Sequence, residues 1–232
     1  MKENLESHEQ KLLQITKIEK QLSEIKDEDI LLENILTAAC EIVHADAGSI
    51  YSYDESCLEL TIRYSLNKTI QKKLAPGEKI PYSSFSMLAT SQSIAGYCAL
   101  NKKIINIADV YNMPEFLDKE KTFPRPYNFN SQNDKNNNYE TRSMLTLPLT
   151  MTNGKVLGIL QIINAQNNEG QIIPFDSDAE FYISHFATTV GQVYEYAYLT
   201  KQLIERLVRM AGYRDPKETG AHVERVSSFA LE

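Results

Sequence analysis

The 232-residue chain has a formal net charge of −7, with 42% hydrophobic and 24% charged residues, a balance typical of a soluble globular protein and unfavourable for general binding to the phosphate backbone of DNA. The three cysteines form no CxxC pair, which argues against a disulfide framework or a thiolate zinc site and fits a reducing cytoplasm. No segment approaches about 18 continuous apolar residues and the N-terminus lacks a signal-peptide core, so we expect a cytoplasmic protein without a membrane span.

Residues 1–28 predict a helix with a narrow apolar stripe. Apolar side chains recur every three or four positions, at Leu12, Ile15, Ile18, Leu22 and Ile25. This spacing is helical, and two interpretations stay open: the stripe packs on its own domain, or it forms a dimer seam. Asp27 to Asp29 then offer an N-cap to a second predicted helix, residues 30–43.

Alternating apolar residues predict an antiparallel pair of strands, Ala47–Tyr53 and Leu58–Tyr64, followed by a short helix at Ser83–Ala89. A strand is expected at Ile104–Ile107. The polar residues 111–140 then form a loop of unusual length, which predicts either a lid or binding loop, or an insertion without function.

The stretch from Ser143 to Asn164 predicts the central hairpin of the domain. Its first strand alternates apolar and other side chains, as a strand with one buried face does. Asn153-Gly154 predicts a type I′ turn, and the return strand is apolar on both faces, as in a covered sheet. A helix that precedes an antiparallel pair and a hairpin favours the α+β class.

One polar residue, Gln161, interrupts the apolar return strand. Period-2 spacing places it on the same face as Leu157, Ile159 and Ile163. A buried amide there needs a hydrogen-bonding partner. The sequence leaves open whether that partner is a ligand or a neighbouring side chain.

A long C-terminal helix is expected after Pro174. Ser177 and Glu180 match a capping box. No helix breaker follows until Asp215-Pro216, so the helix is predicted to continue as one rod through a connecting stretch, residues 199–211.

Two blocks of this sequence resemble GAF domains. SIAGYCALNKKIINIADVYNMPEF is similar to the family pattern "G-I-A-G-x-V-A…N-I-x-D-x-Y…P-x-F". YETRSMLTLPL…GKVLGILQIINA is similar to "R-T-x-S-M-L-x-x-P-L…G-x-V-I-G-V-L-Q-L-I-N". Over residues 29–198 the resemblance implies a six-stranded antiparallel sheet between helices, with a small-molecule pocket on one face and a sensory role in signal transduction.

The blocks resemble in particular the GAF subgroup that binds cyclic nucleotides. Matching that subgroup's pocket positions implies ligand contacts at Ser49, Ile94, Ala95, Tyr111, Thr141 and Gln161. The subgroup's "D-x-x-T-G" motif appears as residues 134–138 without its threonine and glycine. The ligand therefore stays open between a cyclic nucleotide and another small molecule.

Residues 212–232 resemble the beginning of HD-GYP domains. RLVRMAGYRDPKETGAHVERVSSFA is similar to "A-x-x-x-R-D-x-E-T-G-x-H-x-x-R-V", from metal-dependent phosphodiesterases that hydrolyse cyclic di-GMP. The resemblance implies Glu218 and His222 as ligands of a divalent metal of the iron or manganese type. Because the rest of that family's motif is absent, the site is incomplete. No cofactor and no catalysis are expected of this chain, whereas its full-length parent would be a hydrolase.

Two functions follow from these resemblances. In the first, a small molecule enters the pocket and shifts the flanking helices, which control an attached phosphodiesterase. In the alternative, the domain is a structural dimerisation module without a diffusible ligand. A homodimer through the terminal helices is expected in either case.

Overall fold

The computed structural model describes residues 2–75, 78 and 85–214, and side chains are described within residues 8–210. Glu218, His222 and nearly all of the predicted HD-GYP segment lie outside these residues. The helices are α1 (Lys2–Ser23), α2 (Glu28–Ile42), α3 (Lys68–Gln71), α4 (Ile94–Asn101), α5 (Gln132–Asn137) and α6 (Ser177–Arg214). The strands are β1 (Ala45–Asp54), β2 (Glu59–Asn67), β3 (Ser86–Leu88), β4 (Ile105–Ile107), β5 (Met144–Thr150), β6 (Val156–Gln166) and β7 (Ile172–Ile173).

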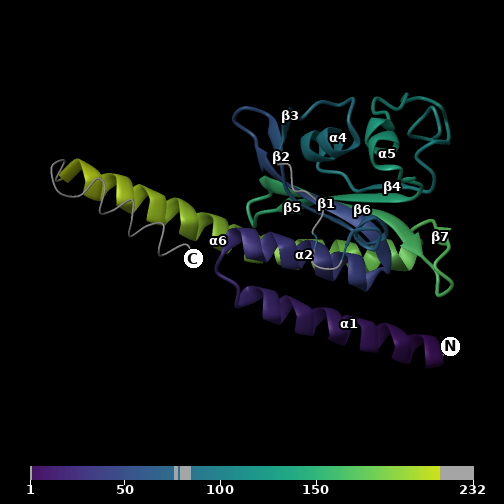
Figure 1. Ribbon diagram of the computed structural model, residues 1–232, viewed down its shortest axis with the longest axis horizontal. Helices are drawn as coiled ribbons and strands as arrows, with labels where there is room; N and C mark the ends of the chain where they lie inside the picture. The colour runs from purple at the N-terminus through teal and green to yellow at the C-terminus, as the bar shows by residue number, and fades with distance from the viewer. Residues whose placement is uncertain (1, 76–77, 79–84, 215–232) are drawn as a thin grey trace.

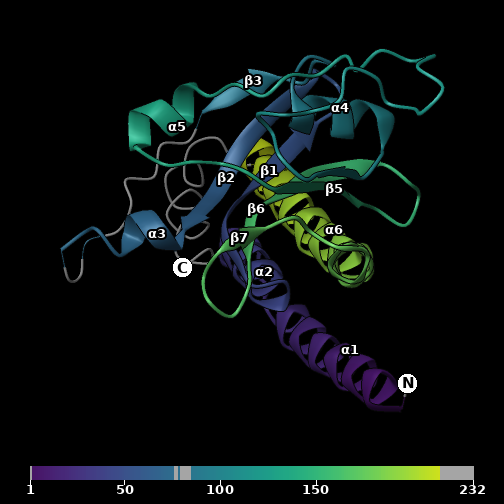
Figure 2. The same ribbon diagram turned by 90° about the vertical axis from the view of Figure 1, so that its right-hand side faces the viewer.

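The strands form one antiparallel sheet in the order β3-β2-β1-β6-β5-β4, and the two-residue β7 pairs with the end of β6. Figures 1 and 2 show α1, α2 and α6 on one face of this sheet and α4, α5 and their connecting segments on the other. The predicted α+β class, an antiparallel sheet between helices, is confirmed. The predicted count of six strands describes the main path of the sheet, to which β7 adds a short seventh.

Each face of the sheet has its own hydrophobic core. On the α2 and α6 side, Leu145, Leu147 and Leu149 of β5 pack with helix side chains such as Phe186, as their alternation predicted. On the other side, the core includes Cys98 of α4. Burial raises the pKa of the Cys98 thiol to about 12, so this cysteine is a packed apolar group rather than a reactive thiolate.

The predicted cap of α2 is confirmed, whereas the predicted capping box of α6 is wrong. Asp27 Oδ1 accepts a hydrogen bond from the Ile30 N–H at 2.9 Å. At α6, Asp176 Oδ1 accepts from the Ala179 N–H at 2.8 Å, so the cap lies one residue before Ser177. With Asp176 as the cap, a reciprocal box would need Glu or Gln at position 179, which is Ala179, and the Glu180 carboxylate instead accepts a hydrogen bond from Asn106 Nδ2 at 2.8 Å.

The central hairpin is present, but its turn is not the predicted type I′. Gly154 has a φ of +80°, whereas Asn153 is not among the residues with positive φ. The Gly154 N–H donates to Met151 O at 2.9 Å, and the Met151 N–H donates to Lys155 O at 2.8 Å. These bonds define a type I turn closed by a left-handed glycine, a longer hairpin loop.

A β-bulge in the hairpin corrects the predicted faces of β6. The register shifts where Leu149 pairs with Gly158 and Thr150 pairs with Val156, which leaves Leu157 without an opposite residue. As a result Leu157 packs in the helix-side core, while Ile159 packs in the core on the opposite face. Leu157 therefore does not share a face with Gln161.

The predicted short helix at Ser83–Ala89 is also wrong over its described part. Ser86–Leu88 forms β3, which pairs with Glu59–Thr61 of β2. Pairing along the edge of β2 determines the conformation of this short segment, since three residues carry little conformational preference of their own.

The apolar stripe of α1 packs within its own chain. Ile15 and Leu22 are buried in the helix-side core, and Leu12, Ile18 and Ile25 pack partly buried against it. Figure 1 shows α1 running alongside α2 and α6. These side chains are therefore engaged inside one protomer, as in the first of the two interpretations, and a dimer seam along the same stripe would require α1 to leave its domain.

The last helix, α6, is a continuous rod of 38 residues, or about 57 Å at 1.5 Å per residue. Its first half covers the sheet, and its second half extends beyond the rest of the described structure (Figure 1). The extended half exposes an apolar stripe, Tyr196, Leu199, Leu203, Leu207 and Met210. Within the described residues, no helix is both long enough and apolar enough to cross a bilayer.

Candidate ligand-binding site

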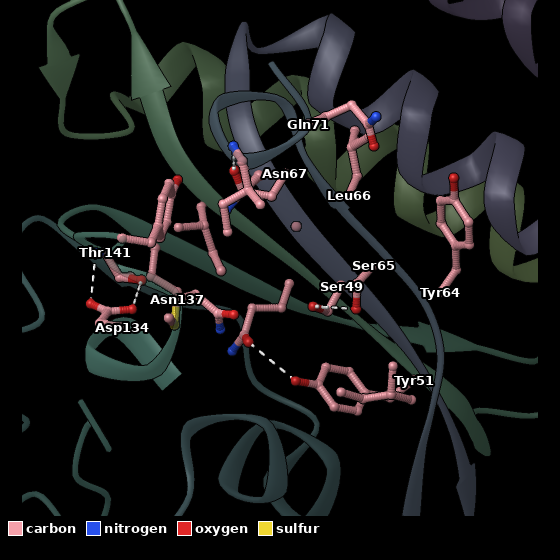
Figure 3. A pocket seen from close by; sticks show the side chains of 18 of the residues that line it. Ser49, Tyr51, Tyr64, Ser65, Leu66, Asn67, Gln71, Asp134, Asn137 and Thr141 are labelled. Atoms are coloured by element: carbon pink, nitrogen blue, oxygen red, sulfur yellow. Dashed lines mark hydrogen bonds between the residues drawn. The ribbon is translucent and has the colours of Figure 1, made fainter. Parts of the chain in front are cut away.

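A cavity of about 770 Å³ lies between the sheet and the segment around α5 (Figure 3). Its described lining comes mainly from β1, β2, α3, β5, β6 and the segment of residues 129–141, and it also includes Glu33 of α2 and Phe85. This volume falls within the range of pockets that enclose small ligands. The long polar loop of the sequence thus contributes one wall of the cavity and contains a helix, α5.

A polar row crosses four adjacent strands at the cavity. Thr146 of β5 pairs with Gln161 of β6, Gln161 pairs with Ser49 of β1, and Ser49 pairs with Ser65 of β2. Directly paired residues lie on the same face of a sheet. The hydroxyl oxygens of Ser49 and Ser65 lie 3.3 Å apart. The row therefore presents hydroxyl and amide groups on a surface that is otherwise largely apolar.

Gln161 is the central member of the polar row and is only 8% exposed. Its Nε2 donates to Thr146 Oγ1 at 3.2 Å, and its Oε1 accepts a long hydrogen bond, 3.5 Å, from the Tyr51 hydroxyl. Burial raises the pKa of Tyr51 to about 12, so the phenol stays protonated and donates. Since an amide has two donor hydrogens and two acceptor lone pairs, these contacts leave Gln161 with capacity for a ligand.

A buried carboxylate, Asp134, holds α5 in place over the cavity. Its Oδ1 accepts from Thr141 Oγ1 at 2.8 Å, and its Oδ2 accepts from the Thr141 N–H at 2.8 Å and from the Tyr111 hydroxyl at 2.7 Å. The hydrogen bond to Asp134, followed by burial, raises the pKa of Tyr111 to about 12. Asp134 thus connects α5 to Tyr111 and Thr141, near the two ends of the segment that the sequence patterns predicted to be a long loop.

Replacing Asp134 with alanine should lower the free energy of unfolding by about 2 kcal/mol, because the buried N–H and hydroxyl of Thr141 would lose their acceptor. Urea unfolding measures this change. The exposed neighbour Lys135, changed to alanine, is the matched control on the same helix and should cost less than about 0.5 kcal/mol. Equal effects of the two changes would show that the Asp134 contacts contribute no particular stability.

Asn164, at the end of β6, anchors the other end of the loop. It is buried with a φ of +57°, a conformation that asparagine tolerates better than most residues. Its Nδ2 donates to the Tyr139 hydroxyl at 2.9 Å and to Glu140 O at 2.7 Å, and its Oδ1 accepts from the Arg142 N–H. The sequence patterns did not identify Asn164 as a site residue. The signal that could have identified Asn164 is its position, because it is a polar residue near the end of an otherwise apolar strand.

The structure brings three of the six predicted pocket residues to the cavity: Ser49, Thr141 and Gln161. Ile94 and Ala95 are instead buried in the core around α4 and do not belong to the described lining. Tyr111 also lies outside that lining. It is 49% exposed, and its ring packs edge-on against Phe129 with centroids 5.3 Å apart. The predicted roles of these three residues as direct contacts therefore do not fit the described cavity.

No metal site is present in the part of the chain that the structure describes, since no three His, Cys, Asp or Glu side chains there are grouped suitably. The predicted ligands Glu218 and His222 lie outside that part. The described site is accordingly a pocket of hydroxyls, amides and carboxylates.

The site thus consists of an antiparallel sheet with helices on one face and a ligand-sized cavity on the other. The family model for the GAF domain matches residues 27–194, well over half of the chain. The chain belongs to the GAF domain family, whose members act in signalling proteins.

Solved structures agree with this fold. The GAF domain of a phosphoenolpyruvate-protein phosphotransferase from Coxiella burnetii has a TM-score of 0.59 at 18% identity, covering 84% of this chain and 98% of that chain. The corresponding domain from Acinetobacter has a TM-score of 0.57 at 17% identity, covering 83% and 98%. Identities this low establish the fold alone.

Curated relatives include the cGMP-specific 3′,5′-cyclic phosphodiesterase of Drosophila melanogaster. That protein is 25% identical over 150 residues, which cover 61% of this chain. The aligned region spans only 12% of the fly protein, so the likeness concerns one part of a much larger molecule.

Proposed function

We propose that this GAF domain is a cytoplasmic small-molecule sensor whose ligand occupies the 770 Å³ cavity and whose occupancy is passed on through α6. The observation that carries this proposal is the polar row. At the centre of this row Gln161 uses one donor and one acceptor within the protein, so one amide hydrogen and one lone pair stay available to a ligand. A diffusible ligand that completes the hydrogen bonds of Gln161 accounts for its presence there.

The described structure offers a physical route from the cavity to α6. Strand β2 contributes Ser65 to the cavity wall, and its Arg63 contacts Glu28 of α2 at 3.4 Å. Glu28 in turn contacts Lys201 of α6 at 2.7 Å. A ligand that displaces β2 would therefore alter the contacts of α6 where that helix leaves the domain. Such control requires the ligand to bind two arrangements of these contacts with different affinity.

Calorimetric binding of a panel of nucleosides, cyclic nucleotides, amino acids and amines tests the proposal. A ligand that binds the wild-type chain should lose at least tenfold in affinity when Gln161 becomes leucine, because the amide contacts vanish. Gln166→Leu, the same chemical change at the end of the same strand, should leave the affinity unchanged. Absence of binding by every compound would favour the alternative, a structural module without a diffusible ligand.

The exposed apolar stripe on α6 supports a homodimer. This holds whether the domain is a ligand sensor or a structural module without a diffusible ligand. The members of the stripe, Tyr196, Leu199, Leu203, Leu207 and Met210, follow spacings of three and four, which suit a helix-to-helix seam. Sedimentation of the chain should give a dimer, and Leu203→Glu together with Leu207→Glu should give a monomer. A monomeric wild-type chain at high concentration would contradict this arrangement.

The segment that follows α6 suggests the output of the sensor. On the resemblance of residues 212–232 to HD-GYP domains, we propose that the parent protein is a cyclic di-GMP phosphodiesterase. In it, Glu218 and His222 would be two ligands of a divalent metal. A carboxylate and an imidazole four residues apart on a helix can bind one metal. Metal analysis and cyclic di-GMP hydrolysis by the full-length parent, with and without Glu218→Ala, test this assignment, and unchanged metal content and hydrolysis would refute it.

A further inference from the structure

The contact between α1 and α6 contains a buried carboxylate, Glu19. This residue lies between Ile15 and Leu22 on the face of α1 that packs against the domain, and it is only 8% exposed. Its Oε1 has no hydrogen-bond partner among the described residues. An ionised carboxylate without a partner is costly to bury. The docked position of α1 therefore carries a cost that an apolar side chain at position 19 would not impose.

Two side chains of α6 face Glu19 and satisfy it only in part. His185 Nε2 lies 4.0 Å from Glu19 Oε1, which is beyond hydrogen-bonding distance. The Thr189 hydroxyl donates to the carbonyl oxygen of His185 at 3.4 Å. Burial raises the pKa of Glu19, and Thr189 and His185 oppose this rise without cancelling it. Among the described charged groups, His185 is the one that acts on the pKa of Glu19, so no cation of α2 or of the sheet offsets the carboxylate.

The other titratable groups of this contact lie nearer the beginning of α1. His8 contacts the Tyr182 hydroxyl, and its Nε2 lies 3.6 Å from Asp178 Oδ2. The His8–Asp178 pair is exposed to solvent, so it contributes little to docking. Burial lowers the pKa of Lys11, a shift that affects docking at alkaline pH. Within the described side chains, Glu19 is thus the carboxylate of this contact that docking removes from water.

Protonation of Glu19 favours the docked position of α1. When α1 leaves α6, Glu19 enters water and regains the ordinary pKa of a glutamate, about 4.5. A group whose pKa is higher in the docked state binds its proton more tightly there. Docking is therefore strongest below about pH 4.5 and weakens as the pH rises through the raised pKa of Glu19. His185 acts in the same direction, because its protonated ring attracts the carboxylate.

We propose that α1 is a pH-sensitive strap on α6, in which ionisation of Glu19 weakens the contact between the two helices and protonation strengthens it. Loosening of the strap uncovers Ile15 and Leu22, which are buried in the docked state. Figure 1 shows that α1 and α6 lie on the helix-covered face of the sheet, opposite α4 and α5. The strap thus acts on the proposed output helix without a ligand in the cavity, and its test is independent of the sensing proposal.

Amide hydrogen exchange of the full chain at pH 5 and pH 8 tests the strap, with rates converted to protection factors so that the intrinsic effect of pH is removed. In the wild-type chain, residues 15–22 should be at least about threefold more protected at pH 5 than at pH 8. Glu19→Leu should raise their protection at pH 8 at least about threefold and remove its dependence on pH. Glu9→Leu, the same change at an exposed position of α1, should leave the wild-type behaviour unchanged.

A second variant, Glu19→Gln, keeps the size of the side chain and removes only the ionisation. It should also lose the pH dependence, and it decides the question if circular dichroism shows that Glu19→Leu does not fold. Equal protection of residues 15–22 at both pH values in the wild-type chain would overturn the proposal. A pH dependence that persists in Glu19→Gln would assign it to another group, such as His8 or Lys11, and would overturn the role of Glu19.

Discussion

Replacement of Gly158 with alanine is expected to destabilise the domain by about 3 kcal/mol, because the central strands leave no space for a side chain there. A Cβ atom at this position would lie 2.3 Å from the carbonyl oxygen of Tyr51 and 3.5 Å from Cε1 of Tyr194. The nearer contact is with backbone, which can move only if β1 and β6 separate. Urea unfolding monitored by circular dichroism measures the loss.

Gly154 provides the control for this prediction. Its Cβ would meet nothing within 4 Å, although its φ is +80°. Alanine there should cost only the left-handed conformational penalty of about 1 kcal/mol. A Gly158→Ala variant no less stable than Gly154→Ala would show that β1 and β6 can separate without cost, which contradicts the tight pairing described above.

A second large effect is expected at Glu28. Replacing Glu28 with alanine in the otherwise unchanged chain should lower the free energy of unfolding by about 3 kcal/mol. Glu28 is 7% exposed and interacts with Arg63 at 3.4 Å, Lys201 at 2.7 Å and the Tyr194 hydroxyl at 3.3 Å. Removing one member of a buried ion network leaves the remaining charges without a partner. Burial, followed by Glu28, raises the pKa of Tyr194, which keeps that hydroxyl a neutral donor.

A double-mutant cycle distinguishes this network from independent contacts. Glu28→Ala and Lys201→Ala should show a coupling energy of about 1 kcal/mol or more, because each removes the other's partner. Glu41→Ala, an exposed glutamate of the same helix, should change stability by less than about 0.5 kcal/mol. Additive effects of the Glu28 and Lys201 changes would show that the two residues do not act together, and would remove the route from β2 to α6.

Local periodicity was sufficient to predict most of the fold. The apolar alternation of β5, the cap at Asp27 and the long rod of α6 all depend on residues close in sequence, so pattern reading identified them. The bulge at Leu157 was missed because one extra residue inverts the faces of a strand without changing its composition. The strand character of residues 86–88 was missed because β2, which is distant in sequence, determines it.

The candidate site was predicted less completely, for a related reason. Gln161 was found because a polar residue on an apolar strand is visible in the sequence, whereas Ser49 was assigned by the resemblance to cyclic-nucleotide-binding GAF domains. Asp134 and Asn164 connect segments far apart along the chain, and their roles depend on hydrogen bonds that no spacing rule reveals. Ile94 and Ala95 were assigned by resemblance alone, and the packing of α4 places them in a core instead of at the cavity.

Amide hydrogen exchange with and without a saturating amount of the tightest probe tests the central claim most directly, namely that α6 responds to the cavity. We predict increased protection in the cavity wall, residues 134–141, together with a change in exchange across residues 199–210 of α6. Both effects should disappear in Gln161→Leu and persist in Gln166→Leu. Protection confined to the cavity wall, with exchange in α6 unchanged, would contradict the claim that this domain transmits ligand binding to its C-terminal helix.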